Sequence, residues 1–313
     1  MGNDLLVAAP ERWDEACFAV PALRAAMATG IGLGVICREE QHQFWQSLAG
    51  LQVFSFPEKT KAKALAATIR GSWQAALLWD AGLAAEAVHL AGVPQRLGPR
   101  TPRALQKRLT QPLGFTEQPM DHRVRYYLSA MEEMGIPTRN PEFFAPANLL
   151  IPPMPHTVLF SPDSDFGPSH EWPLDRWLEI ASRIRHSHHR VAVAIFDGGR
   201  SLGKSLAAQL GDDVERLPVP TFATALPMLA SFSRVIAADG SLPHLAAHVG
   251  ATCVTLFGPN DPVWKRPLGR RHSLVCRHAE CAPCLLAKCP LDLRCQSELE
   301  TERVWASLEK TLG

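Results

Sequence analysis

The chain has neither a strong bias of charge nor a long apolar run. Its 32 basic and 31 acidic residues give a formal net charge of +1, which argues against a nucleic-acid binder of the strongly basic kind. No stretch approaches the about 18 consecutive apolar residues that indicate a transmembrane helix, and the first residues lack the basic start and apolar core of a signal peptide. We therefore expect a globular, cytoplasmic protein without a nucleic-acid partner.

The eight cysteines are unevenly distributed along the chain. Three stand alone in apolar surroundings and are expected to be small core residues: Cys17, Cys37 and Cys253. The other five fall within residues 276–295, and four of these have the spacing C-x2-C-x4-C-x5-C: Cys281, Cys284, Cys289 and Cys295. Four thiolates with this spacing can surround a structural zinc ion, while disulfides and free thiols are the alternatives. In each case we expect the cysteines to hold a loop and to take no part in chemistry.

Apolar, strand-like segments alternate with helical patterns in both halves of the chain. In the first half the expected strands lie at 4–9, 32–37, 52–56, 74–79 and 95–98. In the second half they lie at 157–160, 190–196, 214–219, 234–238 and 252–257. Strands that alternate with helices predict a parallel sheet covered on both faces, so the fold class is α/β with two Rossmann-like domains.

Prolines interrupt the pattern between the two halves, at six positions: Pro137, Pro141, Pro146, Pro152, Pro153 and Pro155. We take residues 137–155 as a linker between a first domain, 1–140, and a second domain, 156–313, that includes the cysteine-rich segment. The two domains are expected to face each other across a cleft, which is the usual place for a substrate.

A basic segment covers residues 94–116, which carry five basic side chains and no acidic one: Arg96, Arg100, Arg103, Lys107 and Arg108. A run of this kind is usually a solvated surface or a mobile loop. It could also meet an anionic acceptor or an acidic membrane surface, so peripheral membrane contact stays open.

The stretch 235–262 says most about chemistry. A short apolar strand stops at Asp239, and Gly240 and Ser241 lead into a helix that carries His244. The free N–H groups at a helix N-terminus attract phosphate, and a glycine lets a ligand approach the backbone. In the alternative interpretation this is an ordinary turn, in which Asp239 caps the helix and His244 packs in the core.

Two other loops are expected at the same edge of the second sheet, at 161–172 and 197–200. Ligands of open α/β sheets bind outside the carboxyl ends of the strands, so these loops and residues 239–244 are well placed to form one site.

Several motifs, in the same order along nearly the whole chain, resemble a known family. ADGSLPHLAAHVGATCVTLFGPNDP, which begins at Ala238, resembles the signature of the lipopolysaccharide heptosyltransferases, glycosyltransferase family 9. SPDSDFGPSHEWPLDRW resembles that family's loop P-G-A-x-x-G-P-A-K-R-W-P. FAVPALRAA, AVHLAGVPQRLGPR and the cysteine-rich tail followed by TERVW are also similar to family segments.

The resemblance implies the two-domain GT-B fold and transfer of a heptose from ADP-heptose to a lipopolysaccharide core or a similar glycan or lipid-linked acceptor. It implies inversion at the sugar carbon, no cofactor for catalysis, and a place in the cytoplasm or at the inner face of the inner membrane. Six residues are then expected to hold the donor diphosphate: Ser164, His170, Asp239, Gly240, Ser241 and His244. Two more are expected near the nucleoside: Asp197 and Gly198.

The sequence departs from the family pattern at the phosphate grip. The family's phosphate-binding Lys falls on His170 and the following Arg on Glu171, and Gly240 stands before Ser241 where the family has the hydroxyl first. Two fixed positive charges thus become one titratable group and one carboxylate, which weakens the expected hold on a diphosphate. A second hypothesis therefore stays open, a diverged binding or scaffold protein that keeps the fold but has lost transfer.

The family's catalytic Asp falls on Glu15, and the Gly before it falls on Asp14. A carboxylate at this position can take the proton of the acceptor hydroxyl, with Asp14 as the second choice. Alternatively, the two side chains merely favour the start of a helix. The nearby segment 80–84, DAGLA, lacks the polar and basic residues expected of an acceptor site.

Overall fold

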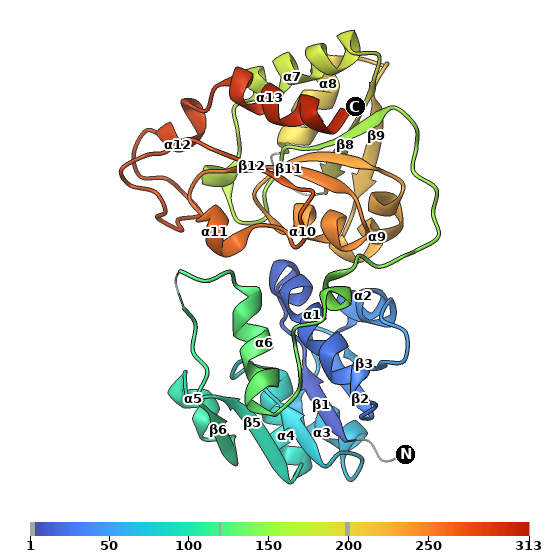
Figure 1. Ribbon diagram of the computed structural model, residues 1–313, viewed down its shortest axis with the longest axis vertical. Coiled ribbons are helices and arrows are strands. Elements are labelled where there is room, and N and C mark those ends of the chain that lie inside the picture. Colours follow the sequence, from blue (N-terminus) through green and yellow to red (C-terminus); the bar gives the residue numbers. More distant parts are fainter. Residues whose placement is uncertain (1–3, 119, 198–200, 313) are drawn as a thin grey trace. The chain divides into compact units, whose positions relative to one another are not determined.

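The computed structural model describes residues 4–118, 120–197 and 201–312. The chain separates into two compact units, Met1–Ala145 and Pro146–Gly313 (Figure 1). Each unit is built on a six-stranded sheet whose neighbouring strands all run parallel. The prediction of two doubly wound parallel sheets is thus confirmed.

The sheet of the first unit has the strand order β3-β2-β1-β4-β5-β6. Its strands are β1 (Leu5–Ala8), β2 (Leu33–Arg38), β3 (Gln52–Phe56), β4 (Ala75–Leu77), β5 (Gln95–Pro99) and β6 (Gln111–Leu113). Its helices are α1 (Trp13–Ala28), η1 (Glu39–Gln41), α2 (His42–Gln46), α3 (Ala62–Ile69), α4 (Leu83–Ala91), α5 (Arg103–Gln106), α6 (Val124–Glu133) and η2 (Pro141–Phe144).

The sheet of the second unit has the strand order β12-β11-β10-β7-β8-β9. Its strands are β7 (Thr157–Ser161), β8 (Arg190–Phe196), β9 (Glu215–Val219), β10 (Arg234–Ala238), β11 (Thr252–Phe257) and β12 (Ser273–Cys276). Its helices are η3 (Pro168–His170), α7 (Leu174–His186), α8 (Leu202–Leu210), α9 (Phe222–Ala230), α10 (Ser241–His248), α11 (Pro262–Lys265), α12 (Arg294–Ser297) and α13 (Thr301–Leu312).

In each sheet, the direction in which successive strands are added reverses at one point. The first unit adds strands outward from β1 to β3, and then outward from β4 on the other side of β1. The second unit does the same from β7 and from β10. The crevices beside β1 and β4, and beside β7 and β10, are therefore the places where such a fold binds ligands.

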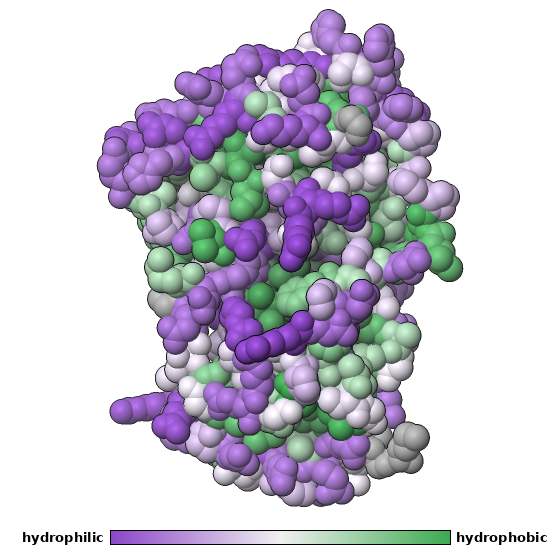
Figure 2. Space-filling view, viewed as in Figure 1, coloured by the Kyte–Doolittle hydropathy of each residue, from purple (hydrophilic) through white to green (hydrophobic). Residues whose placement is uncertain are grey.

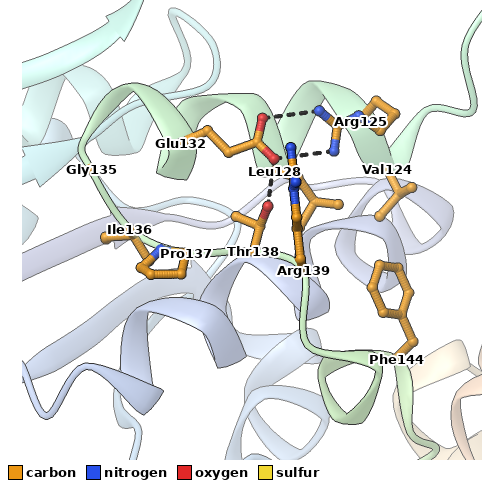
Figure 3. A pocket seen from close by; sticks show the side chains of 10 residues that line it. All are labelled: Val124, Arg125, Leu128, Glu132, Gly135, Ile136, Pro137, Thr138, Arg139 and Phe144. Atoms are coloured by element: carbon orange, nitrogen blue, oxygen red, sulfur yellow. Dashed lines mark hydrogen bonds and ion pairs between the residues drawn. The ribbon is translucent and has the colours of Figure 1, made fainter.

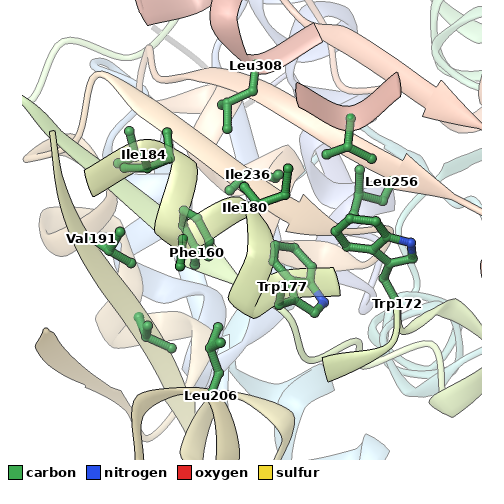
Figure 4. Packing of buried hydrophobic residues seen from close by; sticks show 14 of the residues in the cluster. Phe160, Trp172, Trp177, Ile180, Ile184, Val191, Leu206, Ile236, Leu256 and Leu308 are labelled. Carbon is green, nitrogen blue, oxygen red and sulfur yellow. The ribbon is translucent and has the colours of Figure 1, made fainter. Parts of the chain in front are cut away.

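Buried aromatic and branched side chains hold each sheet to its helices. In the second unit Trp177 of α7 lies 5.7 Å from the ring of Phe160 on β7 and 5.6 Å from that of Trp172 (Figure 4). Ile236 and Leu256 of β10 and β11 belong to the same fully buried cluster. Each such side chain contributes about 1.5–3 kcal/mol by its removal from water, so the strand ends at the crevice rest on a rigid base.

The basic segment 94–116 is a folded part of the sheet, so the expectation of a mobile loop is wrong for its strands, whereas the expectation of a solvated surface holds for three of its basic side chains. It forms β5, α5 and β6, with β6 at the sheet edge. Arg96 donates to the carbonyl oxygens of Val93 and Arg108, both at 2.6 Å, so its charge serves to close this turn. Three of the basic side chains remain exposed: Arg100, Arg103 and Lys107.

Hydrogen bonds hold the proline-rich segment 137–155 in place at two points. Arg24 of α1 donates to the carbonyl oxygens of Phe143, at 3.1 Å, and Ala145. Further along, the amide of Ala147 donates to the carbonyl of His248 at 2.6 Å.

No helix in the described ranges has the length and apolar character needed to cross a membrane. On the face shown in Figure 2, hydrophilic and apolar residues are interspersed.

Candidate functional site

The first polar cluster lies at the β7/β10 crevice of the second unit and is centred on Asp239, directly after β10. One carboxylate oxygen of Asp239, Oδ2, lies 3.0 Å from Nδ1 of His170 and accepts a hydrogen bond from Nδ2 of Asn260 at 2.6 Å. Ser164 donates its hydroxyl to the backbone carbonyl of Asp239 at 2.5 Å. Asp239 and His170 are 0% and 2% exposed. Three of the predicted residues thus meet in one buried network, which Asn260 completes.

Gly240 leaves room for the loop 161–173 to lie against the start of α10. A Cβ atom at this position would come within 2.8 Å of Oδ1 of Asp165 and 3.2 Å of the Ser164 hydroxyl. The N-terminus of α10 is accordingly engaged by that loop, because the Asp165 carboxylate accepts from the amide of Ser241 at 2.7 Å and from its hydroxyl at 2.6 Å. The same amide and hydroxyl were expected to bind a donor phosphate.

The start of α8 is engaged in the same way by a second carboxylate of this loop. Asp163 accepts from the amides of Leu202 and Gly203, at 2.6 and 3.0 Å, and from the hydroxyl of Ser201 at 2.9 Å. Sequence reasoning missed both aspartates, because their partners lie 38 to 40 and 76 residues away. The feature of the sequence that could have indicated these two aspartates is the motif P-D-S-D, which lies in the loop 161–172 already expected at the site.

The residues at the family's Lys and Arg positions shape their own loop. Glu171 accepts from the amide of Ser164 at 3.3 Å, and Gln296 donates to the backbone carbonyl of His170 at 3.0 Å. The same unit holds a buried cation, Lys265 at the end of α11, which is 4% exposed. Lysines are rarely buried to this degree unless they are paired.

The remaining predicted residues of this unit are more scattered. His244 is 2% exposed within α10. Asp197 follows β8 and is exposed. Gly198 lies outside the described residues.

In the first unit, Asp14 and Glu15 lie in the first turn of α1, as the helix-start interpretation expected. Both carboxylates also accept hydrogen bonds from other side chains. Asp14 is 0% exposed and accepts two hydrogen bonds of 3.1 Å from Arg12. Oε2 of Glu15 accepts from Nε of Arg123 at 2.7 Å and from the hydroxyl of Tyr127 at 2.6 Å. Sequence reasoning could not find these two donors, because Arg123, the N-cap residue of α6, and Tyr127 within α6 lie 108 and 112 residues away.

A pocket of about 500 Å³ opens at the β1/β4 crevice. Its lining comes from the loops after β1 and β4 and from α6, and includes Glu11, Glu15, Trp79, Asp80, Arg123 and Tyr126. The segment after β4 itself contributes one polar side chain, Asp80, and the other polar groups of the pocket come from the loop after β1, from α1 and from the start of α6. Aromatic rings next to carboxylates and an arginine suit a ligand rich in hydroxyl groups.

Burial and charge shift several pKa values in this pocket. Partial loss of hydration raises the pKa of the Asp80 carboxyl; the amide of Gly82 acts against this, and the neighbouring Glu11 carboxylate adds to it. Burial also raises the pKa of Tyr126 to about 12. Although burial alone would lower it, the pKa of Arg123 lies above its ordinary value because Glu15 and other acidic groups surround it. Arg123 is therefore a permanent cation at the pocket wall.

Another hollow, of about 910 Å³, runs along α6 and the segment that follows it (Figure 3). Its carboxylate, Glu132, is held by Arg125 at 2.9 and 3.2 Å and by the hydroxyl of Thr138. None of the residues predicted for the site lines it.

The cysteines divide as the sequence suggested. Cys17, Cys37 and Cys253 are buried, which confirms them as core residues, and burial raises the pKa of Cys37 to about 12. The four clustered cysteines are free thiols: Cys281, Cys284, Cys289 and Cys295. In the parts of the chain that the structure describes, no three His, Cys, Asp or Glu side chains are arranged to hold a metal ion. Cys295 is buried and Cys281 is exposed. Burial, and after it the nearby Cys281, Cys284 and Cys289, raises the pKa of Cys295 to about 11, so the four cysteines lie near one another and zinc binding by them stays a prediction.

Comparison with known proteins points to one family. The model of glycosyltransferase family 9 (heptosyltransferase) matches residues 132–294, just over half of the chain. Lipopolysaccharide heptosyltransferase 1 of Pseudomonas aeruginosa is 28% identical over 159 residues, 45% of this chain and 44% of the relative. Lipooligosaccharide heptosyltransferase 2 of Haemophilus influenzae is 24% identical over 123 residues, 37% of this chain and 35% of the relative. The matches thus span less than half the length of these curated relatives.

The likeness of the fold extends further. The solved structure of the Escherichia coli heptosyltransferase WaaC with ADP has a TM-score of 0.78 and 17% sequence identity to this chain, and the match covers 98% of this chain and 99% of that one. At this identity the likeness shows the fold alone, and that fold is GT-B.

Proposed function

The chain belongs to glycosyltransferase family 9, and from that premise we propose that it transfers a heptose or a related sugar from an ADP-linked donor to a hydroxyl of a lipopolysaccharide core or similar glycan. The observation that carries the proposal is the polar network of Ser164, His170, Asp239 and Asn260 at the β7/β10 crevice. It lies where an open α/β sheet binds its ligand, beside a helix N-terminus that favours a diphosphate. The donor half of the reaction is thus assigned to the second unit.

The acceptor is assigned to the pocket at the β1/β4 crevice. Its carboxylates, Arg123 and the aromatic ring of Tyr126 can hydrogen-bond and stack on a sugar. A carboxylate of this pocket takes the proton of the attacking hydroxyl, the step that the family resemblance assigns to Glu15. The sugar carbon is inverted, and the residues named need no metal or cofactor for this step.

A lipid-linked acceptor would bring the protein to the inner face of the inner membrane. The exposed cations Arg100, Arg103 and Lys107 support contact with an anionic surface there, because each basic residue near such a surface contributes about 1 kcal/mol.

The donor assignment is tested by thermal unfolding with ADP and with ADP-heptose. A ligand at 100 times its Kd stabilises the folded state by about 2.7 kcal/mol, which raises the Tm measurably. We expect both compounds to raise the Tm, adenosine to do so less, and Asp239→Asn to reduce the effect. An unchanged Tm at millimolar ADP and ADP-heptose would remove the donor assignment.

One observation favours the second candidate, a binding or scaffold protein without transfer. Asp163 and Asp165 already engage the helix N-termini at the donor crevice, so an anionic ligand must compete with two carboxylates of the protein itself. Release of ADP from ADP-heptose in the presence of heptose-free lipopolysaccharide core separates the two candidates. Donor binding without any ADP release would favour the scaffold.

A further inference from the structure

The three carboxylates that line the β1/β4 pocket differ in their partners. Glu11 is paired with Arg38 at 2.8 Å, and Glu15 is paired with Arg123 at 2.7 Å. Asp80 has no basic partner within the described ranges of the chain. Of the three carboxylates, Asp80 therefore contributes least to the ion pairs that stabilise the pocket.

Glu15 is poorly placed to receive a proton. Its Oε2 atom already accepts two short hydrogen bonds, from Arg123 and from the hydroxyl of Tyr127. Charge-assisted bonds of this kind are strong, and they compete with any proton offered by a ligand. Their structural result is to fix Arg123, whose guanidinium lies 4.3 Å from the ring centroid of Tyr126.

Asp80 is accessible and is held in one orientation by a single bond. Its carboxylate accepts from the amide of Gly82 at 2.7 Å. A Cβ atom at residue 82 would lie 2.8 Å from Oδ1 of Asp80 and 3.8 Å from Oε1 of Glu11. The glycine thus allows the Asp80 and Glu11 carboxylates to lie close together. Burial is the main cause of the raised pKa of Asp80, and the Glu11 charge adds to it; a carboxylate with a raised pKa is a better proton acceptor.

Other charged and titratable groups surround Asp80 on every side of the pocket: Glu11 and Arg12 from the loop after β1, Glu15 from α1, and Arg123, Tyr126 and Tyr127 from α6. Arg108 approaches from the segment after α5, where it donates to the carbonyl of Ala81 at 3.1 Å and lies 3.7 Å from Glu86. Trp79, next to Asp80, is 5% exposed, and its indole N–H has no hydrogen-bond partner in the described part of the chain.

Resting on the transfer proposed above, we infer that Asp80 takes the proton of the acceptor hydroxyl and that Glu15 is a positioning residue for Arg123 and Tyr127. The O–H bond breaks and its proton passes to a carboxylate oxygen of Asp80. The hydroxyl oxygen bonds to the anomeric carbon of the donor. The bond from that carbon to the diphosphate oxygen breaks, and its electron pair leaves with ADP.

The test measures ADP release from ADP-heptose, with heptose-free lipopolysaccharide core as acceptor, across pH. Asp80→Asn is expected to lower kcat by about 100-fold or more, the usual range for loss of a general base, and to abolish the acidic limb of the pH profile. The Tm shift by ADP should stay unchanged. Asp80→Glu should recover part of the rate. Glu15→Gln should raise the KM for the acceptor and keep the acidic limb.

Glu11→Gln provides an independent check. Loss of the Glu11 charge should move the acidic limb of kcat/KM to lower pH, since that charge raises the pKa of Asp80. Asp213→Asn makes the same chemical change as Asp80→Asn on an exposed loop before β9 and should have no effect. An acidic limb that disappears in Glu15→Gln and persists in Asp80→Asn overturns the assignment. A wild-type protein that neither binds ADP nor releases it refutes the proposed function itself, and this inference with it.

Discussion

At the scale of one residue, the raised pKa of Asp80, the base proposed above, also affects the stability of the fold. The pKa of Asp80 is raised in the folded protein, so the folded state binds more protons than the unfolded state and stability falls as pH rises through the folded pKa. At neutral pH the ionised carboxylate opposes folding. Residues placed for activity commonly carry such a cost.

Asp80→Asn is therefore expected to raise stability while it removes activity. The amide oxygen of Asn can still accept from Gly82, and the unfavourable charge is gone. We expect a Tm higher by about 1–2 °C at pH 7, a small effect because the side chain is exposed. The difference should vanish near pH 3, where Asp80 is protonated in both states. A difference that is the same at both pH values would show that charge is not its cause.

The residues of the site could be predicted where a motif keeps them together in the sequence or where a family motif marks them, as it did for Ser164 and His170. Asp239, Ser241 and His244 lie within one turn and helix, so their grouping follows from a single motif. Arg123 and Tyr127 come to Glu15 from a helix more than 100 residues away, and no pattern in the sequence links them. The neighbours of Asp80 in the pocket could not be predicted for the same reason, since Arg123 and Tyr126 lie more than 40 residues from Asp80.

At the scale of elements, α10 is the helix at whose N-terminus we propose that the donor diphosphate binds. In the structure the Asp165 carboxylate bonds to the amide and the hydroxyl of Ser241. A diphosphate at this helix needs the same donors and is repelled by the same charge.

Asp165→Asn is therefore expected to tighten ADP binding. Its amide oxygen can keep one hydrogen bond to Ser241 while the negative charge is lost. We expect the Kd to fall about tenfold, equal to about 1.4 kcal/mol, as measured by isothermal titration calorimetry. The ligand-free protein should lose about 0.5–2 kcal/mol of stability because the helix start is less well satisfied.

Asp213→Asn again serves as the control for charge, because it lies before β9 at the opposite edge of the same sheet. It should leave the ADP Kd unchanged. Equal affinity in Asp165→Asn and wild type would show that Asp165 and the diphosphate do not compete for α10.

Elements with a strong pattern were predictable, and short or polar ones were not. Buried strands such as β10 and β11 are continuous apolar runs, which indicate a parallel sheet. β6 spans three residues, Gln111–Leu113, of which two are exposed, and its strand conformation depends on pairing with β5. Cations on the surrounding segment suggested a surface loop, while Arg96 in fact bonds to backbone carbonyls.

At the scale of the whole molecule, the proposed reaction is divided between two sheets with the same order of strands. Each has one reversal point, and each reversal point carries a polar cluster, with Asp239 in the second unit and Asp80 in the first. The alternation of strands and helices predicts both sheets. The reversal points depend on strand order, which the sequence alone does not reveal.

Hydrogen exchange on the full chain tests the proposed assignment of the donor to the second unit and of the acceptor to the first. ADP should slow exchange of backbone amides in residues 161–173 and 239–248, because ligand binding stabilises the elements it contacts. It should leave residues 79–83 unchanged. Heptose-free lipopolysaccharide core should give the reverse pattern, with protection of residues 79–83 and 123–127 at the β1/β4 pocket. Asp239→Asn should weaken the response to ADP and preserve the response to the acceptor, since the two networks share no residue. Protection by ADP that centres on the first unit would show that the donor binds at the other crevice.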